Sequence, residues 1–169
     1  MTPVLTTERL ILRAPHAEDW PAYLAFRRSP RSALGGNLAT GEIWSQFAAF
    51  FGHWALRGFG RFIITDRASG DAIGHVGPFF PEGWQEPELT WTLWNDAREG
   101  RGIAFEAARA ARDHAFRDLG WKTAVSYIDL ANTRSQALAR RLGAVHERTD
   151  PGHAKPFQIW RHPLPERIA

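Results

Sequence analysis

The chain contains no cysteine among its 169 residues. Disulfide bonds, thiolate-bound zinc and a cysteine nucleophile are therefore excluded. No apolar run reaches membrane-spanning length, and the first residues, MTPVLTTERLILR, carry charges where a secretory signal peptide needs an apolar core. We therefore expect a soluble, cytoplasmic protein with no membrane partner.

Concentrated positive charge is also missing. The formal net charge is +3 and the isoelectric point is near 9.9, yet the arginines are scattered from Arg9 to Arg167 and mixed with 18 acidic residues. No basic run or basic helix face results, so nucleic acid is not an expected partner. A net positive charge still favours a small polyanionic ligand.

Two common nucleotide-binding motifs are absent as well. A P-loop needs Gly-Lys-Ser/Thr, and a dinucleotide-binding fold needs several strand–helix–strand units and a third glycine where this chain has Phe105. Internal repeats, low-complexity segments and interdomain linkers are not evident. With 44% apolar residues, eight Trp and eleven Phe, residues 1–169 are expected to form one domain with one core.

A glycine turn that runs into a long helix is the most informative stretch of the chain. It extends from Glu99 to Gly120 with the sequence EGRGIAFEAARAARDHAFRDLG. Spacings of three and four residues give a narrow apolar stripe of Ala104, Ala108, Ala111, Ala115 and Leu119. The opposite face is charged, and it carries Glu106, Arg109, Asp113 and Arg117 at spacings that allow ion pairs along the helix.

The start of this helix suggests an anion site. A helix N-terminus has four unpaired N–H groups and a partial positive charge, and Arg101 adds a full one. A single Gly-x-Gly pattern fits a phosphate cradle, and it also fits a tight strand-to-helix turn without any ligand. Both interpretations stay open on this stretch alone.

The rest of the pattern predicts a run of antiparallel strands followed by a strand–helix–strand unit. The expected strands are 8–14, 61–66, 72–79, 88–94, 121–128, 144–148 and 157–161. The other expected helices are 16–28, 42–57 and 132–142, with Thr40 as the cap of the second. The long helix must connect two parallel strands by a right-handed crossover. Ligands of such units bind beyond the carboxyl ends of the strands, here beside Trp94, Gly102 and Asp129.

Four segments, in this order, resemble the GNAT superfamily of acyl-CoA-dependent N-acetyltransferases. They are TERLILR, ELTWTLW, EGRGIAFEAA and VSYIDLANTRSQALARRLGA. The chain is most similar to the Rim-type branch, which includes ribosomal-protein N-terminal acetyltransferases. The resemblance implies an α/β fold with a mixed, largely antiparallel, V-shaped central sheet flanked by helices. Acetyl-CoA would lie where the strands ending at Trp94 and Ile128 splay apart.

The resemblance also implies a set of acetyl-CoA contacts. They are Leu93, Trp94, Arg101, Gly102, Ile103, Ala104, Asn132 and Ser135. The two strand residues would pair with the pantetheine, and the four turn residues would hold the pyrophosphate. The last two residues would lie beside the pantetheine arm. Both residue types also suit helix capping, and the two roles need not exclude each other.

The chemistry of such an enzyme needs few side chains. An amine attacks the thioester directly, so the protein must orient the amine, supply it neutral and stabilise the developing oxyanion. A backbone N–H near Leu93 is the family's usual oxyanion donor. Glu88 is our first candidate for the general base, directly or through a water, and His75 and Asp129 are the next candidates. Each of these three side chains also has a purely structural interpretation.

The chain departs from the family pattern at two positions. Many members begin the glycine motif with Gln or Arg, where this chain has Glu99. Many also place a tyrosine seven residues after the asparagine as the acid for the leaving thiolate, and here Ala139 occupies that position. The Rim-type branch often lacks this tyrosine, so Ser135, water or no protein acid at all remain open. Tyr127 is expected to pack.

The acceptor pocket is expected across the sheet from the glycine turn. Its walls would be the loops 29–40 and 81–87 and the start of the second helix. Trp44 and Trp84 offer flat rings over which an amine can rest, and His75 is the third predicted substrate contact. Few acidic residues occur in these segments, which favours a single amine on an apolar or peptide-like body over a polyamine. Core packing of both tryptophans is the alternative.

These features together predict an acetyl-CoA-dependent N-acetyltransferase. Its acceptor would be the primary amine of a small molecule or of a peptide or protein N-terminus. The alternative is a non-catalytic acyl-CoA-binding protein of the same fold. No metal is expected, and a homodimer is left open.

Overall fold

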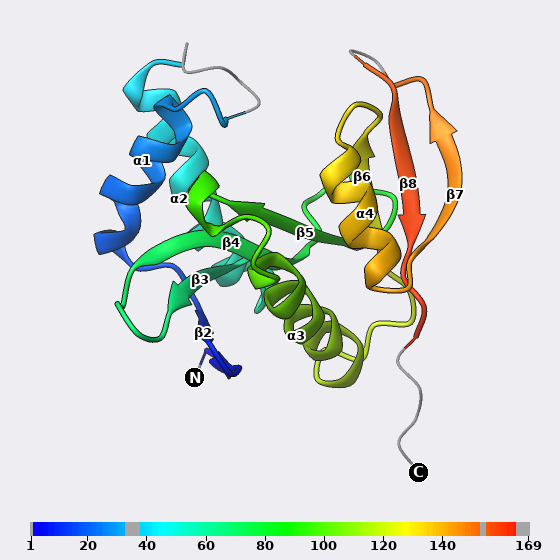
Figure 1. Ribbon diagram of the computed structural model, residues 1–169, viewed down its shortest axis with the longest axis horizontal. Coiled ribbons are helices and arrows are strands. Elements are labelled where there is room, and N and C mark those ends of the chain that lie inside the picture. The colour runs from blue at the N-terminus through cyan, green and yellow to red at the C-terminus, as the bar shows by residue number, and fades with distance from the viewer. Residues whose placement is uncertain (1, 33–37, 153–154, 165–169) are drawn as a thin grey trace.

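The computed structural model describes residues 2–32, 38–152 and 155–164. Within them, one sheet has the strand order β1-β2-β3-β4-β5-β6-β8-β7 (Figure 1). Its strands are β1 (Leu5–Thr6), β2 (Leu10–Arg13), β3 (Phe62–Asp66), β4 (Ala72–Phe79), β5 (Glu88–Leu93), β6 (Val125–Asp129), β7 (Val145–Asp150) and β8 (Phe157–Arg161). The α-helices are α1 (Trp20–Arg28), α2 (Thr40–Arg57), α3 (Ile103–Arg117) and α4 (Thr133–Arg141).

The sheet divides between β5 and β6. These two strands run parallel and pair at one position, Glu88 with Val125, whereas the other neighbours are antiparallel. Beyond that pair the strands diverge into an N-terminal arm (β1 to β5 with α1, α2 and α3) and a C-terminal arm (β6, β7 and β8 with α4) (Figure 1). The predicted mixed, largely antiparallel, V-shaped sheet is confirmed.

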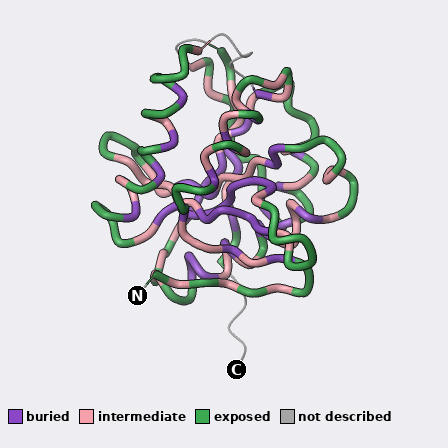
Figure 2. The backbone as a smooth tube through the Cα atoms, turned by 90° about the vertical axis from the view of Figure 1, so that its left-hand side faces the viewer, coloured by how far each residue is buried: buried purple, intermediate pink, exposed green. Residues whose placement is uncertain are grey.

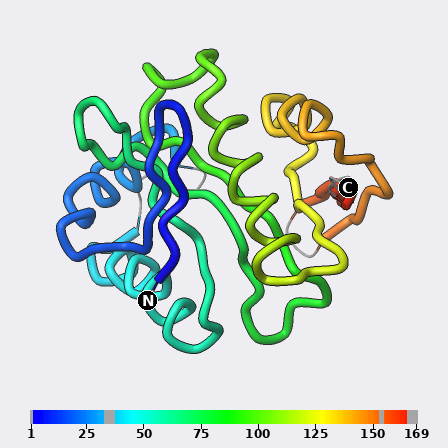
Figure 3. The backbone as a smooth tube through the Cα atoms, turned by 90° about the horizontal axis from the view of Figure 1, so that it is seen from below, coloured from blue at the N-terminus to red at the C-terminus, as the bar shows by residue number. Residues whose placement is uncertain are grey.

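The N-terminal arm has a helical layer on each face of its sheet. Side chains alternate along β3, so Phe62 and Ile64 pack toward α3 while Ile63 packs with α1 and α2. Figure 3 shows α3 crossing the middle of the molecule, with the other helices of the N-terminal arm on one side of it and the C-terminal arm on the other. Figure 2 shows buried residues gathered around the central strands. The arms are also joined through α3, because Arg112 Nη1 donates to the Leu142 carbonyl at 2.7 Å.

The apolar side of α3 is wider than the alanine stripe. The buried residues of the helix are Ile103, Ala107, Ala108, Ala111, His114, Ala115 and Phe116. Ala104 and Leu119 are only partly buried. The spacing allows Glu106 to form an ion pair along the helix, but its carboxylate binds Thr7 and Arg9 of the β1–β2 hairpin. The hairpin is therefore tied to the first turn of α3.

Several predicted boundaries shift by a few residues. The predicted strand 121–128 begins only at Val125, and the predicted strand 144–148 extends to Asp150. Thr40 is the first residue of α2 rather than its cap, and the cap is Ala39, whose N–H donates to Glu42 at 2.8 Å. The predicted loop 29–40 lies partly outside the described residues. No helix in the described part of the chain has the length and apolar character needed to cross a bilayer.

Candidate active site

A cavity of about 1070 Å³ opens where β5 and β6 separate. One end lies between the glycine turn and α4, where it is lined by Gly100, Gly102, Ile103, Asn132 and Ser135. The other end lies on the α1 and α2 face of the sheet, where it is lined by Tyr23, Arg27, Gln46, Arg61 and His75. The two ends meet along β5, so one continuous space reaches both faces of the sheet.

The glycine turn presents bare backbone donors to this cavity. Gly102 is the N-cap of α3 and has a φ of +75°, which glycine adopts at little cost and other residues disfavour. The first backbone bond of the helix runs from the Glu106 N–H to the Gly102 carbonyl, at 3.0 Å. The N–H groups of Ile103, Ala104 and Phe105 precede this bond, so they have no partner within the helix. All three residues line the cavity, which gives it an anion site.

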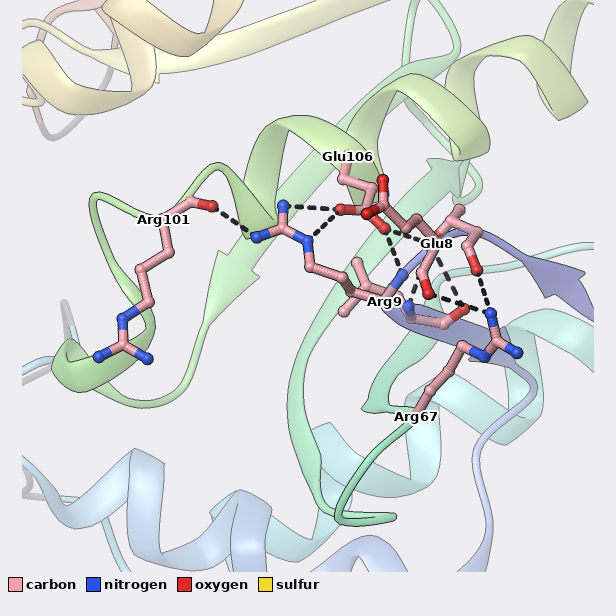
Figure 4. A network of polar contacts seen from close by, with 7 residues as sticks. Glu8, Arg9, Arg67, Arg101 and Glu106 are labelled. Carbon is pink, nitrogen blue, oxygen red and sulfur yellow. Dashed lines mark hydrogen bonds and ion pairs between the residues drawn. The ribbon is translucent and has the colours of Figure 1, made fainter.

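The β1–β2 hairpin holds the glycine turn from outside the cavity. Arg9 Nη1 donates to the Arg101 carbonyl at 2.8 Å, and Arg9 Nε donates to Glu106 at 2.7 Å (Figure 4). Glu106 also accepts from the Thr7 hydroxyl at 2.6 Å. The Arg101 side chain is exposed and extends away from this network (Figure 4). Its predicted contact with a pyrophosphate therefore has no counterpart in the cavity lining and stays a prediction.

Two arginines of α4 add positive charge to the same end of the cavity. Arg134 and Arg141 are seven residues apart, so they share a helix face with Ser135 and Leu138, and all four line the cavity. The Arg141 guanidinium lies 4.0 Å from the centre of the Phe105 ring. Neither arginine is predicted from the sequence above, although both are spaced around the implied pantetheine residues, and that spacing is a signal for them.

Glu99 bridges the two arms at the cavity. Its carboxylate pairs with Arg31, which follows α1, and with Arg134 of α4, at 2.5 Å for the latter. The residue that departs from the family pattern at the start of the glycine motif is therefore an ion-pair partner of both arms. Within the described residues, no carboxylate other than that of Glu99 forms an ion pair with an α4 side chain that lines the cavity.

Asn132 and Ser135 combine capping with exposure to the cavity. Asn132 is the N-cap of α4, and its Oδ1 accepts from the Ser135 N–H at 3.0 Å. The Ser135 Oγ accepts from Trp91 Nε1 at 3.1 Å. Both residues line the cavity, so the two interpretations of the sequence coexist. Ala139 is instead fully buried in the C-terminal arm.

The end of β5 offers one free backbone donor to the gap. The Trp94 N–H donates to the Ile73 carbonyl of β4 at 2.8 Å. Because successive N–H groups of a strand point to opposite sides, the Leu93 N–H points toward the gap from which β6 has diverged. Leu93 also lines the cavity. The Trp94 ring packs with Tyr23 and Phe26 on the α1 and α2 face, and Trp94 is not among the residues that line the cavity.

Glu88 lies at the closed end of the V, where β5 still pairs with β6. Its carboxylate is buried and accepts from Trp84 Nε1 at 3.1 Å. Burial raises the pKa of Glu88 to about 7, against the opposing effects of the Trp84 N–H, the Tyr127 backbone N–H and the charge of Arg61. Five residues of extended strand, roughly 16 Å, separate Glu88 from Leu93. A proton from an amine near Leu93 can therefore reach Glu88 only through intervening water.

His75 lines the cavity but does not offer a free lone pair. Its Nδ1 accepts from Trp94 Nε1 at 2.9 Å, which leaves Nε2 as an N–H donor in the neutral ring. Burial, with the charges of Arg61 and Arg27, holds the pKa of His75 well below its ordinary value. Asp129 accepts from the Ala131 N–H at 2.9 Å and pairs with Lys155, so its carboxylate is engaged in local structure.

The two tryptophans predicted to contact substrate lie outside the cavity lining. Trp44 is half-exposed and packs edge-on against Trp20 of α1, with ring centres 4.9 Å apart. Trp84 packs against Phe79 and donates to Glu88. The α2 residues that reach the cavity are Gln46 and Ala49, on a different face of the helix from Trp44.

Comparison with known proteins gives the family. Residues 9–145 match the family model described as an acetyltransferase (GNAT) domain. The chain belongs to the GNAT family. It is a GNAT acetyltransferase, and the resemblance seen in its sequence is confirmed.

Solved GNAT structures agree along nearly the whole chain. An acetyltransferase from Agrobacterium tumefaciens str. C58 is 37% identical, with a TM-score of 0.86 over 95% of this chain and 94% of that one. A protein of Bordetella pertussis assigned to the GNAT acetyltransferases is 26% identical, with a TM-score of 0.84 over 95% and 99%. A ribosomal L7/L12 alpha-N-protein acetyltransferase in complex with coenzyme A is 16% identical, with a TM-score of 0.76 over 96% and 98%. At that identity it shows a shared fold alone.

The residues of the cavity fit acetyl-CoA, which GNAT enzymes use. Three backbone N–H groups and two α4 arginines can meet its phosphates. The Leu93 N–H, Asn132 and Ser135 follow along the gap. Clusters of His, Asp or Glu that could hold a metal ion are not found among the described residues.

Proposed function

We propose that this GNAT acetyltransferase moves an acetyl group from acetyl-CoA to a primary amine that enters from the α1 and α2 face of the sheet. The observation that supports this most is the continuity of the cavity, which joins the glycine turn at one end to α1, α2 and β4 at the other. Two substrates can enter from opposite faces and meet beside Leu93. A binding protein with no second substrate has no need of the second end.

Acetyl-CoA supplies an acetyl group activated as a thioester, and the residues around it have separate tasks. The N–H groups of Ile103 and Ala104, with Gly102 allowing close approach, would hold the pyrophosphate. Asn132 and Ser135 would flank the pantetheine. The Leu93 N–H would stabilise the developing negative charge on the acetyl oxygen, because it is fixed in the strand and has no sheet partner on that side.

Glu88 and Ser135 are the proposed proton-transfer residues. Glu88 would accept the proton of the amine through water, since a carboxyl with a pKa of about 7 can both take up and release a proton near neutral pH. The Ser135 Oγ accepts a hydrogen bond from Trp91, which leaves its own proton free to donate toward the leaving sulfur.

The test of this function is acetyl-CoA turnover with a panel of small amines and N-terminal peptides. Thiol release and the mass of the acetylated product are measured together, and we expect one acetylated amine for each thiol released. Gly102→Val, which adds a branched side chain at a φ of +75°, serves as the control with an impaired acetyl-CoA site. Tight acetyl-CoA binding with no acetylated product from any amine would favour the non-catalytic alternative.

A further inference from the structure

The end of the cavity on the α1 and α2 face carries unpaired positive charge. We call it the acceptor chamber and define it by Tyr23, Arg27, Gln46, Arg61 and His75. The Nε and Nη2 atoms of Arg27 are buried, and neither has a hydrogen-bond partner among the described residues. Buried guanidinium donors without partners are costly, so these two donors favour a hydrogen-bond acceptor, which a ligand can supply.

Arg61 is the second cation of the chamber. Its guanidinium is stacked on Phe50 and Phe79, at 4.1 Å and 4.4 Å from the ring centres. Stacking uses the flat faces of the guanidinium and leaves its N–H edges available for a planar anion. Burial lowers the pKa of Arg61 to about 10, so the group still carries its charge at neutral pH.

The other charged groups around the chamber do not cancel these two arginines. Arg31, which also lines the cavity, is already paired with Asp96 and Glu99. Glu88 attracts Arg61, but burial keeps a substantial fraction of its carboxyl protonated near neutral pH. His75 is neutral and presents its Nε2–H. The chamber therefore has an excess of positive charge and of hydrogen-bond donors.

We propose that the acceptor amine carries an oxyanion group, a carboxylate or a phosphonate-type group, which binds Arg27 and Arg61 in the acceptor chamber. This inference rests on the proposed function and names the class of its acceptor. Guanidinium groups match both kinds of oxyanion by paired hydrogen bonds. The sequence alone favoured a mostly apolar or peptide-like acceptor body, whereas the buried arginines select an amino-acid-like one.

This arrangement also orients the acceptor. An ammonium group is repelled by the two guanidinium groups, so the amine end turns away from them, toward Leu93 at the gap. Neighbouring cations also favour the neutral form of an amine over its ammonium form. A zwitterionic acceptor would therefore be held by its anion and presented in the form that can attack.

The first experiment measures kcat/KM for matched acceptors that differ only in the anion. L-Phenylalanine is compared with L-phenylalaninamide, L-methionine with L-methioninamide, and 2-aminoethylphosphonate with 2-aminoethanol. We expect the anionic member of at least one pair to be preferred by about tenfold or more. A preference in the amino-acid pairs identifies a carboxylate, and one in the last pair identifies a phosphonate-type group. Equal values within all three pairs would overturn the proposal while leaving acetyl transfer intact.

Variants connect such a preference to the chamber. Arg27→Gln and Arg61→Gln should each remove most of it and leave the KM for acetyl-CoA unchanged. Arg61→Lys keeps the positive charge and should retain part of the preference for the anionic acceptor. It keeps the proposal testable if Arg61→Gln does not fold. Arg28→Gln is the matched control, because Arg28 is the next residue of α1, is exposed and binds the Thr40 hydroxyl outside the cavity. A preference that survives in Arg27→Gln and Arg61→Gln would contradict the proposal.

A binding measurement separates this inference from the proposed function. Calorimetry in the presence of coenzyme A compares N-acetyl-L-phenylalanine with its amide, and N-acetyl-2-aminoethylphosphonate with N-acetylethanolamine. At least one acid should bind about tenfold more tightly in the parent, and equally to its neutral partner in Arg27→Gln. If an acid binds more tightly in this way but no amine is acetylated, the proposed function is refuted and the anion site stands. Turnover with acid and neutral ligands bound equally would refute the anion site alone.

Discussion

Burial and hydrogen bonding act in opposite directions on the carboxyl group of Glu88. Removal from water favours the protonated form, whereas the Trp84 N–H and the Tyr127 backbone N–H favour the charged one. Burial is the larger effect, and the pKa rises to about 7. Because these opposing effects place the pKa close to neutral pH, small changes around the carboxyl alter its protonation, and its role can be tested by the pH dependence of the rate.

Replacing Glu88 with Gln should lower kcat by roughly 10²-fold and leave acetyl-CoA affinity close to the parent value. A base must be deprotonated to act, so the rate of the parent should rise as pH increases through about 7, the pKa of Glu88. This rise should be absent in Glu88→Gln. Glu86→Gln is the control, because Glu86 lies two residues earlier and is paired with Arg161. An unchanged pH–rate profile in Glu88→Gln would assign the proton to bulk water.

Replacing Trp84 with Phe should move that rise to higher pH. The substitution keeps an aromatic ring against Phe79 but removes the N–H that donates to Glu88. Loss of a donor to the charged form raises the pKa of the carboxyl further, by about one unit. The measurement is the pH dependence of kcat/KM. Trp44→Phe should leave the profile in place, since Trp44 packs on Trp20 instead, and a shift of equal size there would disconnect the effect from the hydrogen bond.

At the scale of elements, the glycine turn and α3 were predictable because their signal is local. Spacing alone gives the long helix, the glycines before it and the strand on either side. What spacing cannot give is a partner distant in sequence. Glu106 binds Arg9, 97 residues earlier, and no pattern within one helix distinguishes such a partner from Arg109. The charged face of a helix is therefore predictable, but its ion pairs are not.

Changing Gly102 to Ala should weaken acetyl-CoA binding by about tenfold or more. At a φ of +75° an alanine is strained, so the turn shifts and the N–H groups of Ile103 and Ala104 lose their direction. Gly70→Ala is the matched control, because Gly70 has a φ of +79° in the exposed β3–β4 turn, with open space around it. Calorimetry measures the acetyl-CoA affinity of both variants, which carry similar backbone strain at two different turns. Equal losses of affinity would attribute the effect to stability rather than to the turn.

Arg9 should support acetyl-CoA binding without touching the ligand. Arg9→Gln removes the donor to the Arg101 carbonyl and the ion pair with Glu106, which hold the two sides of the glycine turn. We expect affinity for acetyl-CoA to fall several-fold. Arg67→Gln is the control, because Arg67 binds the Thr7 and Glu8 carbonyls of the same hairpin and, among the described residues, forms no hydrogen bond or ion pair with α3 (Figure 4). Parent-like affinity in Arg9→Gln would limit Arg9 to a role in folding.

At the scale of the whole molecule, the fold was predictable but half of the site was not. The order of strands and helices, with one parallel connection, is enough to give the V-shaped sheet. The acceptor chamber is assembled from α1, α2, β4 and Arg61, the residue before β3, and Arg27 and Arg61 come together only through the packing of these elements. Their neighbours in sequence carry no shared pattern. The sequence pattern of aromatic residues beside loops predicted Trp44 and Trp84 as substrate contacts instead, and both lie outside the cavity lining.

Acetyl-CoA should stabilise the protein because its site draws on both arms. Gly102 and Leu93 belong to the N-terminal arm, and Ser135 and Arg141 belong to the C-terminal arm. A ligand at a hundred times its Kd adds about 2.7 kcal/mol to the free energy of unfolding. For a domain of this size that raises Tm by roughly 5 to 10 °C. Thermal melts with and without acetyl-CoA measure it, and Gly102→Ala should shift less at the same concentration. A parent Tm that does not move at millimolar acetyl-CoA would refute the site.

Because β5 and β6 pair at a single position, we expect the two arms to unfold as separate cooperative units. Apart from the bonds of Val125 and Ser126 to Pro87 and Leu89, the strand pairing of β6 is with β8 and that of β8 continues to β7. The C-terminal arm should therefore open while β1 to β5 stay paired. A destabilising substitution in that arm therefore acts locally. It would release half of the cofactor site at temperatures where most of the secondary structure persists, so that activity is lost well before the fold.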